Sequence, residues 1–340
     1  MKTLQVDIHS HLLPEDVMGK AEKYGPELVE EPHGGISMRV GEYKSRSKPG
    51  DRFLRDPRFS DPKARIDDMD ANGIDVMGVT ISPLFYLYWA EPRIGIEFSK
   101  FQNDSLANFC RPYPDRLFHI PTLPLQDIDA SIKEMDRAIN DLGGRGINIG
   151  TDDLAGRTLD EQALWPLYEQ VQKYDKPMFI HPHPQTMHDA TAEDRYNLSW
   201  IAGYVHQETV AVSHLIFGGV LDEFPDLKIC IPHGGGSVPY QWGRLEYAAK
   251  TMPDVKCKKP LREYLKNFYF DIIVHDLKAR EFLVDFMGVD NLLVGSNYMG
   301  WDAVNSFEFA EQLNLSEEDK AKITGGTAIK LFKLDQTAAK

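Results

Sequence analysis

The sequence contains few cysteines, no long apolar run and no cluster of positive charge, and each absence excludes a class of protein. Its three cysteines, Cys110, Cys230 and Cys257, are odd in number and show no metal-type spacing, which argues against a disulfide scaffold and a cysteine metal site. No uncharged apolar stretch approaches the roughly 20 residues of a membrane span, and the amino terminus, MKTLQVDIHS, lacks the apolar segment of a signal peptide. We therefore expect a cytoplasmic protein without a membrane partner.

Positive charge is also in the minority. Lysine and arginine number 38 against 52 aspartates and glutamates, and the formal net charge of −14 repels nucleic acid and anionic lipid. Nucleic acid is therefore not an expected partner. Hydrophobic residues make up 42% of the 340, which is enough to bury a sizeable core in one large domain.

Eight short apolar runs have the length and composition of β-strands. They span residues 4–8, 76–81, 117–120, 146–149, 178–181, 227–231, 267–273 and 291–295. Helical patterns separate several of them: Asp61-Pro62 begins one that ends at Gly73, and Thr158 with Glu161 forms a capping box before another. Alternating strands and helices indicate an α/β protein with a parallel sheet. The count of eight predicts one domain, residues 1–340, folded as a (β/α)8 TIM barrel, with a doubly wound sheet as the alternative.

Two segments interrupt the alternation. Residues 12–60 are rich in glycine, proline and charge, and they are far longer than the usual connection of about 2–6 residues in α/β folds. We predict that they form a small insert after strand 1, placed as a lid over the active site. Residues 182–210 form a second long loop. In it His183, and more weakly His188 beside Asp189, could add a site group, but an ordinary loop role is the preferred interpretation.

Four histidines fall at the same ends of three predicted strands. His9 and His11 end the first strand, His181 ends the fifth, and His233 follows the sixth. In parallel barrels the chemistry lies at this end. Residues two apart on a strand point the same way, so His9 and His11 can reach one ion, and a third imidazole completes a site with an open position. Any one of these histidines alone would be interpreted as a hydrogen-bonded core residue, but the set predicts a bound metal.

The same pattern, with HxH after strand 1, histidines after strands 5 and 6 and an acid after strand 8, is that of the amidohydrolase superfamily. The surrounding sequence resembles its aminocarboxymuconate-semialdehyde decarboxylase branch. The similar segments are DIHSHLLP, RIDDMDANGIDVMGVTISP, PYPDRLFHIPTLPLQD, FIHPH, GGVLDEFPDLKICIPHGGG, GRLEY, MGVDNLLVGSNY and KITGGTAIKLF. They cover nearly the whole chain in order, so the resemblance is specific.

The resemblance implies a metal site. His9, His11 and His181 would be ligands, and Asn297, which stands in the place of the acid, would also lie at the metal. Many superfamily members bridge two metals with a carboxylated lysine on strand 4, but this strand reads GRGINIG, with Asn148 and no lysine. One divalent ion, zinc or manganese, is therefore expected.

The resemblance also implies a reaction, the loss of CO2 from an aromatic or enol-type carboxylic acid without redox chemistry. His233 would be a catalytic or substrate-orienting imidazole, and Arg244 in WGRLEY would bind a small-molecule carboxylate, unless it only forms an ion pair near Glu246. A homodimer is expected, with an arginine of one subunit approaching the site of the other. The alternatives are another metal-dependent hydrolase, hydratase or oxygenase on the same scaffold, or a partner subunit with a degenerate site.

Position 297 departs from the family pattern. In LLVGSNYMGWD the apolar strand breaks at Gly295 and delivers Asn297, an amide that offers a carbonyl oxygen but cannot act as a general acid or base at neutral pH. Three interpretations follow: a substitution introduced for an original aspartate, proton transfer by another group such as His233 or a metal-bound water, or divergence toward different chemistry. Asn297 thus occupies both a metal position and a catalytic position.

Three residues near the strand ends have less specific interpretations. Asp271 ends the seventh strand, where it would orient a neighbour at the mouth or cap the backbone. Tyr298 and Trp301 follow the eighth strand and would either line a pocket for a planar substrate or simply pack.

Overall fold

The computed structural model describes residues 3–184 and 195–335. Eight parallel strands form its centre, and each overlaps a run predicted from the sequence. They are β1 (Val6–Leu12), β5 (Val76–Ile81), β6 (Leu117–His119), β7 (Ile147–Gly150), β8 (Pro177–His181), β9 (Lys228–Ile231), β10 (Phe268–Asp271) and β11 (Leu292–Leu293). The largest shift is at β1, which continues to Leu12 because residues 10–12 still pair with β5. His9 and His11 therefore lie within a strand.

The strands form two arcs, ordered β1-β5-β6 and β11-β10-β9-β8-β7, and backbone contacts join the arcs at both seams. At one seam, Ile8 N donates to Val294 O at 3.1 Å and Tyr298 N donates to His9 O at 3.0 Å. At the other, Asn148 N donates to Pro121 O at 2.7 Å. The strands thus close into a ring, and the predicted (β/α)8 barrel is confirmed. The doubly wound alternative is wrong, because such a sheet keeps two free edges.

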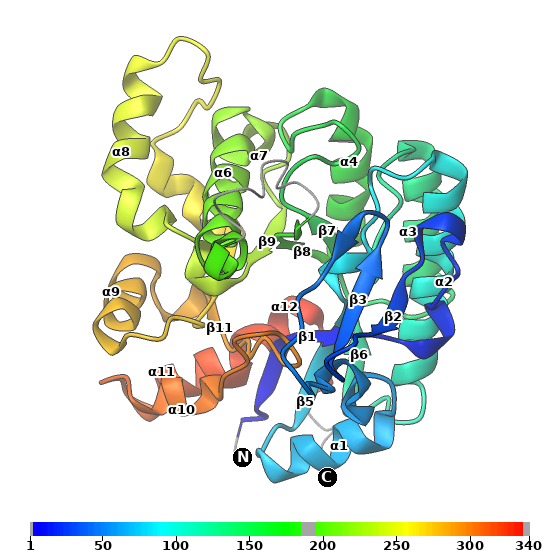
Figure 1. Ribbon diagram of the computed structural model, residues 1–340. Helices are drawn as coiled ribbons and strands as arrows, with labels where there is room; N and C mark the ends of the chain where they lie inside the picture. The colour runs from blue at the N-terminus through cyan, green and yellow to red at the C-terminus, as the bar shows by residue number, and fades with distance from the viewer. Residues whose placement is uncertain (1–2, 185–194, 336–340) are drawn as a thin grey trace.

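Helices surround the barrel (Figure 1). The carboxylate of Asp61 caps α1, as the sequence predicts. The predicted capping box forms only in part: Glu161 accepts from Thr158 N at 3.0 Å, but the Thr158 hydroxyl donates to Asp160, and α4 begins only at Trp165. None of the described helices is long and apolar enough to cross a membrane. The helices are α1 (Pro62–Ala71), α2 (Pro92–Cys110), α3 (Ile128–Asn140), α4 (Trp165–Tyr174), α6 (Tyr204–Phe217), α7 (Val220–Glu223), α8 (Val238–Thr251), α9 (Leu277–Met287), α10 (Ser306–Glu311), α11 (Glu317–Ala321) and α12 (Thr327–Phe332).

Apolar side chains fill one end of the barrel. Val6 and Ile8 at the start of β1 pack with Phe118, Phe179 and other strand residues, and the apolar face of α12 completes this cluster. A larger continuous core lies between the strands and the helices. With one end closed by apolar packing, polar groups that gather inside the barrel must do so at the carboxyl-terminal end of the strands.

Residues 12–60 contain a small antiparallel sheet formed by β2 (Glu27–Glu30), β3 (Ile36–Val40) and β4 (Tyr43–Lys44). Tyr24, which precedes this sheet, packs edge-on against Trp89, with ring centroids 4.6 Å apart, and the contact attaches the insert to the loop before α2. Burial raises the pKa of Tyr204, which lies beside the histidines, and the nearby Tyr43 adds to the effect. Tyr43 of the insert therefore lies near Tyr204, and closure of the insert over the barrel mouth stays a prediction.

Candidate metal centre

Four histidines meet at the carboxyl-terminal end of the barrel. His9 and His11 lie in β1, His181 is the last residue of β8, and His233 follows β9. The centre of the His9 ring is 5.1 Å from that of His11, 5.1 Å from that of His181 and 5.4 Å from that of His233. The structure thus brings together the four imidazoles that the sequence places at strand ends.

Hydrogen bonds turn one nitrogen of His9 toward one nitrogen of His181. His9 Nδ1 lies 3.0 Å from Oδ2 of Asp271, and His181 Nδ1 lies 2.6 Å from the carbonyl oxygen of Pro182. Since both partners accept, both Nδ1 atoms carry the proton. The two Nε2 atoms then face each other with lone pairs, 3.2 Å apart. Two ligands of one tetrahedral zinc are separated by about 3.3 Å, so the pair has the spacing of metal ligands.

His11 and Asn297 repeat this arrangement. The Thr80 hydroxyl donates to the carbonyl oxygen of Ser10 at 2.8 Å, so it accepts from His11 Nδ1, 3.2 Å away. The Nε2 of His11 therefore carries a lone pair, and it lies 2.9 Å from the amide oxygen of Asn297. A second pair of acceptors thus faces each other, with no proton between them.

Burial keeps the three imidazoles of this set neutral. It lowers the pKa of His9 and of His181 well below the ordinary value, and it lowers the pKa of His11 to about 3. The charges that neighbouring histidines would carry add to this effect. Neutral imidazole nitrogens and an amide oxygen that face one another in this way suit a divalent metal ion.

His233 is held differently from the other three. Within the described parts of the chain, the nitrogens of His9, His181 and His233 lie within 4.8 Å of one another and could together hold an ion. However, His233 Nδ1 lies 2.6 Å from Oε1 of Glu208, whose side chain is completely buried. Burial alone would lower the pKa of His233, but the charge and hydrogen bond of Glu208 raise it to about 9. With its pKa raised, His233 keeps a second proton more readily than the other three histidines, and this favours a proton-carrying role over ligation.

The turn that places His233 requires glycine. His233 has a φ of 50°, and Gly234, Gly235 and Gly236 follow with φ values of 67°, 75° and 65°. Side chains rarely tolerate this left-handed backbone region. A Cβ added to Gly235 would also come within 2.4 Å of the Phe270 ring. The IPHGGG motif therefore allows the sharp turn that sets the imidazole at the mouth.

Asp271 orients His9, which is one of the two roles expected for it. Its other oxygen accepts from the backbone nitrogens of Gly234 and Ile273, both at 3.1 Å, so the carboxylate links β1, β10 and the turn after β9. Burial raises the pKa of Asp271 to about 7, while the charge of His233 and the two backbone donors oppose the rise. Fixing the tautomer and orientation of a metal-facing histidine is a common task of such a carboxylate.

Sequence reasoning missed Glu208. It lies on α6 with both Tyr204 and Ala211, at helical spacings, on the buried face. A glutamate on a largely apolar helix face was the available signal, because a carboxylate is seldom buried without a partner. That partner, His233, comes from a different strand end.

A family model described as Amidohydrolase matches residues 6–334 of the chain. The chain belongs to this amidohydrolase family. The 2-amino-3-carboxymuconate-6-semialdehyde decarboxylase of Dictyostelium discoideum is 32% identical over 344 residues, which cover 98% of this chain and 93% of the relative. A γ-resorcylate decarboxylase of a Rhizobium species is 29% identical over 286 residues, covering 80% of this chain and 86% of the relative. The resemblance inferred from the sequence is confirmed.

Solved structures agree with this assignment. A 5-carboxyvanillate decarboxylase from Novosphingobium aromaticivorans, solved with bound manganese and 3-methoxy-4-hydroxy-5-nitrobenzoic acid, is 25% identical to this amidohydrolase. The two superpose with a TM-score of 0.82 over 98% of this chain and 97% of that chain. The barrel is therefore the family fold.

The structure does not join Arg244 to the histidine set of this amidohydrolase. The residue lies exposed on α8, and none of the residues that the structure describes forms a hydrogen bond or ion pair with it. The alternative ion pair with Glu246 is also missing, since that carboxylate accepts from Trp242 Nε1 at 3.0 Å. Its substrate-binding role stays a prediction.

Two aromatic side chains contact the imidazoles of the amidohydrolase site. Tyr204 lies edge-on to His181, with ring centroids 6.2 Å apart, and Phe179 lies edge-on to His9, at 5.2 Å. Trp301 packs against Trp200, with ring centroids 6.4 Å apart, and a role in lining a substrate pocket stays a prediction. Tyr298 instead packs over the buried guanidinium of Arg65, at 4.5 Å, which is the packing alternative. His188 and Asp189 lie outside the described residues.

His183 does not join the metal-facing set. Its Nε2 lies 3.0 Å from the carbonyl oxygen of Asp152, and its ring packs edge-on against Tyr86 and Tyr88. These contacts hold it beside the loop after β7. The preferred interpretation, an ordinary loop role, agrees with this placement.

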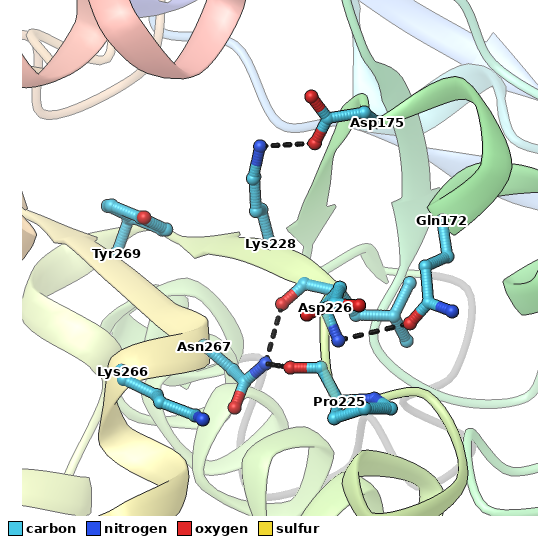
Figure 2. A pocket seen from close by; sticks show the side chains of 9 residues that line it. Gln172, Asp175, Pro225, Asp226, Lys228, Lys266, Asn267 and Tyr269 are labelled. Atoms are coloured by element: carbon cyan, nitrogen blue, oxygen red, sulfur yellow. Dashed lines mark hydrogen bonds and ion pairs between the residues drawn. The ribbon is translucent and has the colours of Figure 1, made fainter.

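A hollow, shown from close by in Figure 2, lies at the end of the barrel where the strands begin. It is lined by the first residues of strands, such as Lys228 of β9, and by Asn267 just before β10. The polar groups there satisfy one another: Lys228 pairs with Asp175, and Asn267 Nδ2 donates to the carbonyl oxygens of Pro225 and Leu227, both at 2.8 Å. This hollow offers no converging lone pairs, so the chemistry is assigned to the histidine end.

Proposed function

We propose that this amidohydrolase is a metal-dependent, non-oxidative decarboxylase of an aromatic or enol-type carboxylic acid. The observation that carries the proposal is that metal-facing lone pairs and a proton-carrying histidine meet at one end of the barrel. Neutral lone pairs of His9 and His181 face each other, those of His11 and Asn297 do the same, and His233, whose pKa is raised, lies beside His9. The relatives that the chain resembles carry decarboxylase names, which supports this reaction class.

One divalent ion, manganese or zinc, would be held by Nε2 of His9, His11 and His181 and by Oδ1 of Asn297. The bound ion would supply positive charge for the substrate's carboxylate and a neighbouring oxygen. Asp271 and Thr80 hold the tautomers of His9 and His11 that present these lone pairs. Manganese in a related structure supports the choice of metal.

His233 supplies the proton that decarboxylation consumes. Its Nδ1–H donates to Glu208, which leaves Nε2 to carry a proton to the substrate. The bond between the substrate carbon and its carboxyl carbon breaks, CO2 leaves, and the electron pair stays on the substrate carbon. That carbon takes the proton from Nε2, and solvent returns a proton to the ring. Proton transfer from His233 would allow the reaction to proceed although position 297 carries no acid.

The test is CO2 release from a panel of aromatic and enol carboxylates by the protein loaded with Mn²⁺ or Zn²⁺. In D2O, each product should carry one deuterium at the carbon that loses CO2. His233→Asn should lower kcat by about 100-fold or more while metal content is kept, since a general acid contributes roughly 10²–10⁴-fold. The matched control is His206→Asn, an exposed histidine on α6. Absence of CO2 release, or release that does not depend on metal, would refute the proposal.

We further propose a homodimer formed through α8. Tyr240 and Tyr247 have 83% and 67% of their surface exposed, and with Arg244 they follow the i, i+4, i+7 spacing of one helix face. Large exposed aromatic residues on one face are typical of an interface, and a second copy would carry Arg244 toward the partner's substrate carboxylate.

Tyr240→Glu with Tyr247→Glu should yield a monomer in analytical ultracentrifugation. Arg244→Ala should keep the dimer and raise KM for the carboxylate substrate. A wild-type protein that stays monomeric up to millimolar concentration would contradict the dimer.

A further inference from the structure

The side chain of Asn297 lies between two groups that accept hydrogen bonds. On one side its Oδ1 faces His11 Nε2 at 2.9 Å, and on the other its Nδ2 donates to the carboxylate of Asp302. A carboxylate can only accept, so the amide must turn its NH2 group toward Asp302. Asp302 thereby determines that the oxygen, and not the nitrogen, faces the histidines.

The chain is folded so that residues 297 and 302 meet. Val304 N donates to Ser296 O at 3.0 Å, and this contact closes the turn between them. Asn297 adopts a φ of 48°, and a Cβ added to Gly300 would come within 2.1 Å of the amide oxygen. Glycine at position 300 therefore leaves the space that the amide occupies.

Asp302 has few other partners. Its side chain is 12% exposed, and besides Asn297 the only described residue that pairs with it is His275, whose Nε2 lies 3.7 Å away and whose side chain is 61% exposed. Asn297 is therefore the main partner of this carboxylate.

We propose that Asn297 and Asp302 together replace a single aspartate: the amide presents a neutral oxygen to the metal, and Asp302 holds the negative charge one hydrogen bond away. Asp302 is then a positioning residue that acts through Asn297. A charged acceptor on the NH2 group draws the amide's electron density toward Oδ1, because linked hydrogen bonds strengthen one another. This inference rests on the proposed metal centre.

The arrangement predicts that the effect of Asp302 depends on residue 297. Beside the amide, the carboxylate orients and polarises a ligand, so its loss weakens metal binding. Beside an aspartate at position 297, it would be a like charge in direct contact, and the two carboxylates would share a proton that competes with the metal, so the loss of Asp302 removes that competition. A role confined to folding of the turn would give the same effect in both backgrounds.

The experiment is a double-mutant cycle on metal affinity, with the wild type, Asp302→Asn, Asn297→Asp and the double variant. Affinities for Mn²⁺ and Zn²⁺ are measured by competition with a chelator at pH 8, with the melting temperature of the metal-free protein as a folding measure. Asp302→Asn should weaken binding about 10- to 100-fold, as is usual for a partner that orients a ligand. In the Asn297→Asp background, the same change should leave binding equal or tighter.

Asp226→Asn is the matched control, because it removes one exposed carboxylate at the opposite barrel end, and it should leave affinity unchanged. Equal effects of Asp302→Asn in both backgrounds would overturn the paired role while leaving the metal centre intact. A wild-type protein that binds neither metal would instead overturn the metal centre, and the assignment of Asp302 with it.

Discussion

The two ends of the barrel both gather polar side chains, but they pair them differently. At the amino-terminal end, Lys228 meets Asp175, and Asn267 donates to two carbonyl oxygens, so donors match acceptors. At the carboxyl-terminal end, acceptors meet acceptors: Nε2 of His9 faces Nε2 of His181, and Nε2 of His11 faces an amide oxygen. Unmatched lone pairs are costly in a folded protein unless something completes them. The first end is therefore structural, and the second is built to receive a cation.

The largest effect should come from removing one of the facing lone pairs. His181→Ala deletes an imidazole nitrogen 3.2 Å from that of His9. We expect metal affinity to fall by more than about 100-fold, because loss of a ligand exceeds the roughly 10- to 100-fold effect of losing an orienting partner. Metal analysis of the purified protein measures this, and decarboxylation should fall in parallel. Full metal occupancy in the variant would remove His181 from the ligand set.

The second-largest effect should come from a change in the protonation of His233, with metal binding left intact. Glu208→Gln removes the charge that raises the pKa of His233 to about 9. The protonated ring is present below that pKa and is lost as pH rises through it, so the variant should lose activity at a lower pH than the wild type. At neutral pH we expect kcat to fall about 100-fold with KM and metal content little changed. A pH profile of kcat measures the shift, and an unchanged alkaline limb would argue against His233 as the acid.

A smaller effect is expected from the carboxylate that orients His9. Asp271→Asn keeps the shape of the side chain but removes the charge that accepts from His9 Nδ1 at 3.0 Å. Metal affinity should fall about tenfold, at the low end for such partners, because the amide oxygen can still accept. Chelator competition measures the change. An effect as large as that of His181→Ala would show that Asp271 does more than orient the ring.

The smallest effect should come from the opposite end of the barrel. Lys228→Met removes an ion pair with Asp175, whose side chain is 51% exposed and which also pairs with Lys333 at 2.6 Å. Exposed pairs contribute about 1 kcal/mol or less, so urea unfolding should shift only slightly, and metal content and activity should not change. A marked loss of activity would break the distinction between the two ends.

Much of the candidate site could be predicted from local sequence. His9 and His11 sit two residues apart in one strand, and His181 and His233 follow apolar runs, so strand alternation and parallel order alone bring them to one end. Asp271 was found in the same way. The positions agree with the structure because they depend only on strand order, while the roles of these residues stay predictions.

Other contacts in the candidate site could be identified only from the folded structure. Glu208 reaches His233 from a helix, and Thr80 supports His11 from the neighbouring strand, although nothing close to either residue in sequence marks the pairing. Tyr298 shows the reverse case, since it follows the last strand as a pocket residue would, yet packs over Arg65. Which side chain faces which depends on how distant elements pack.

Position 297 separates the two sources of information most clearly. The sequence by itself determined that an amide stands where the family pattern has an acid, and that it follows a buried strand at the barrel mouth. Only the tertiary structure decided that a carboxylate lies next to this amide, because the turn through Gly300 brings Asp302 back onto the Asn297 side chain. Five residues of separation do not predict that contact. It exists because the backbone bends in a left-handed conformation at Asn297, and Ser296 and Val304 then hold the turn closed.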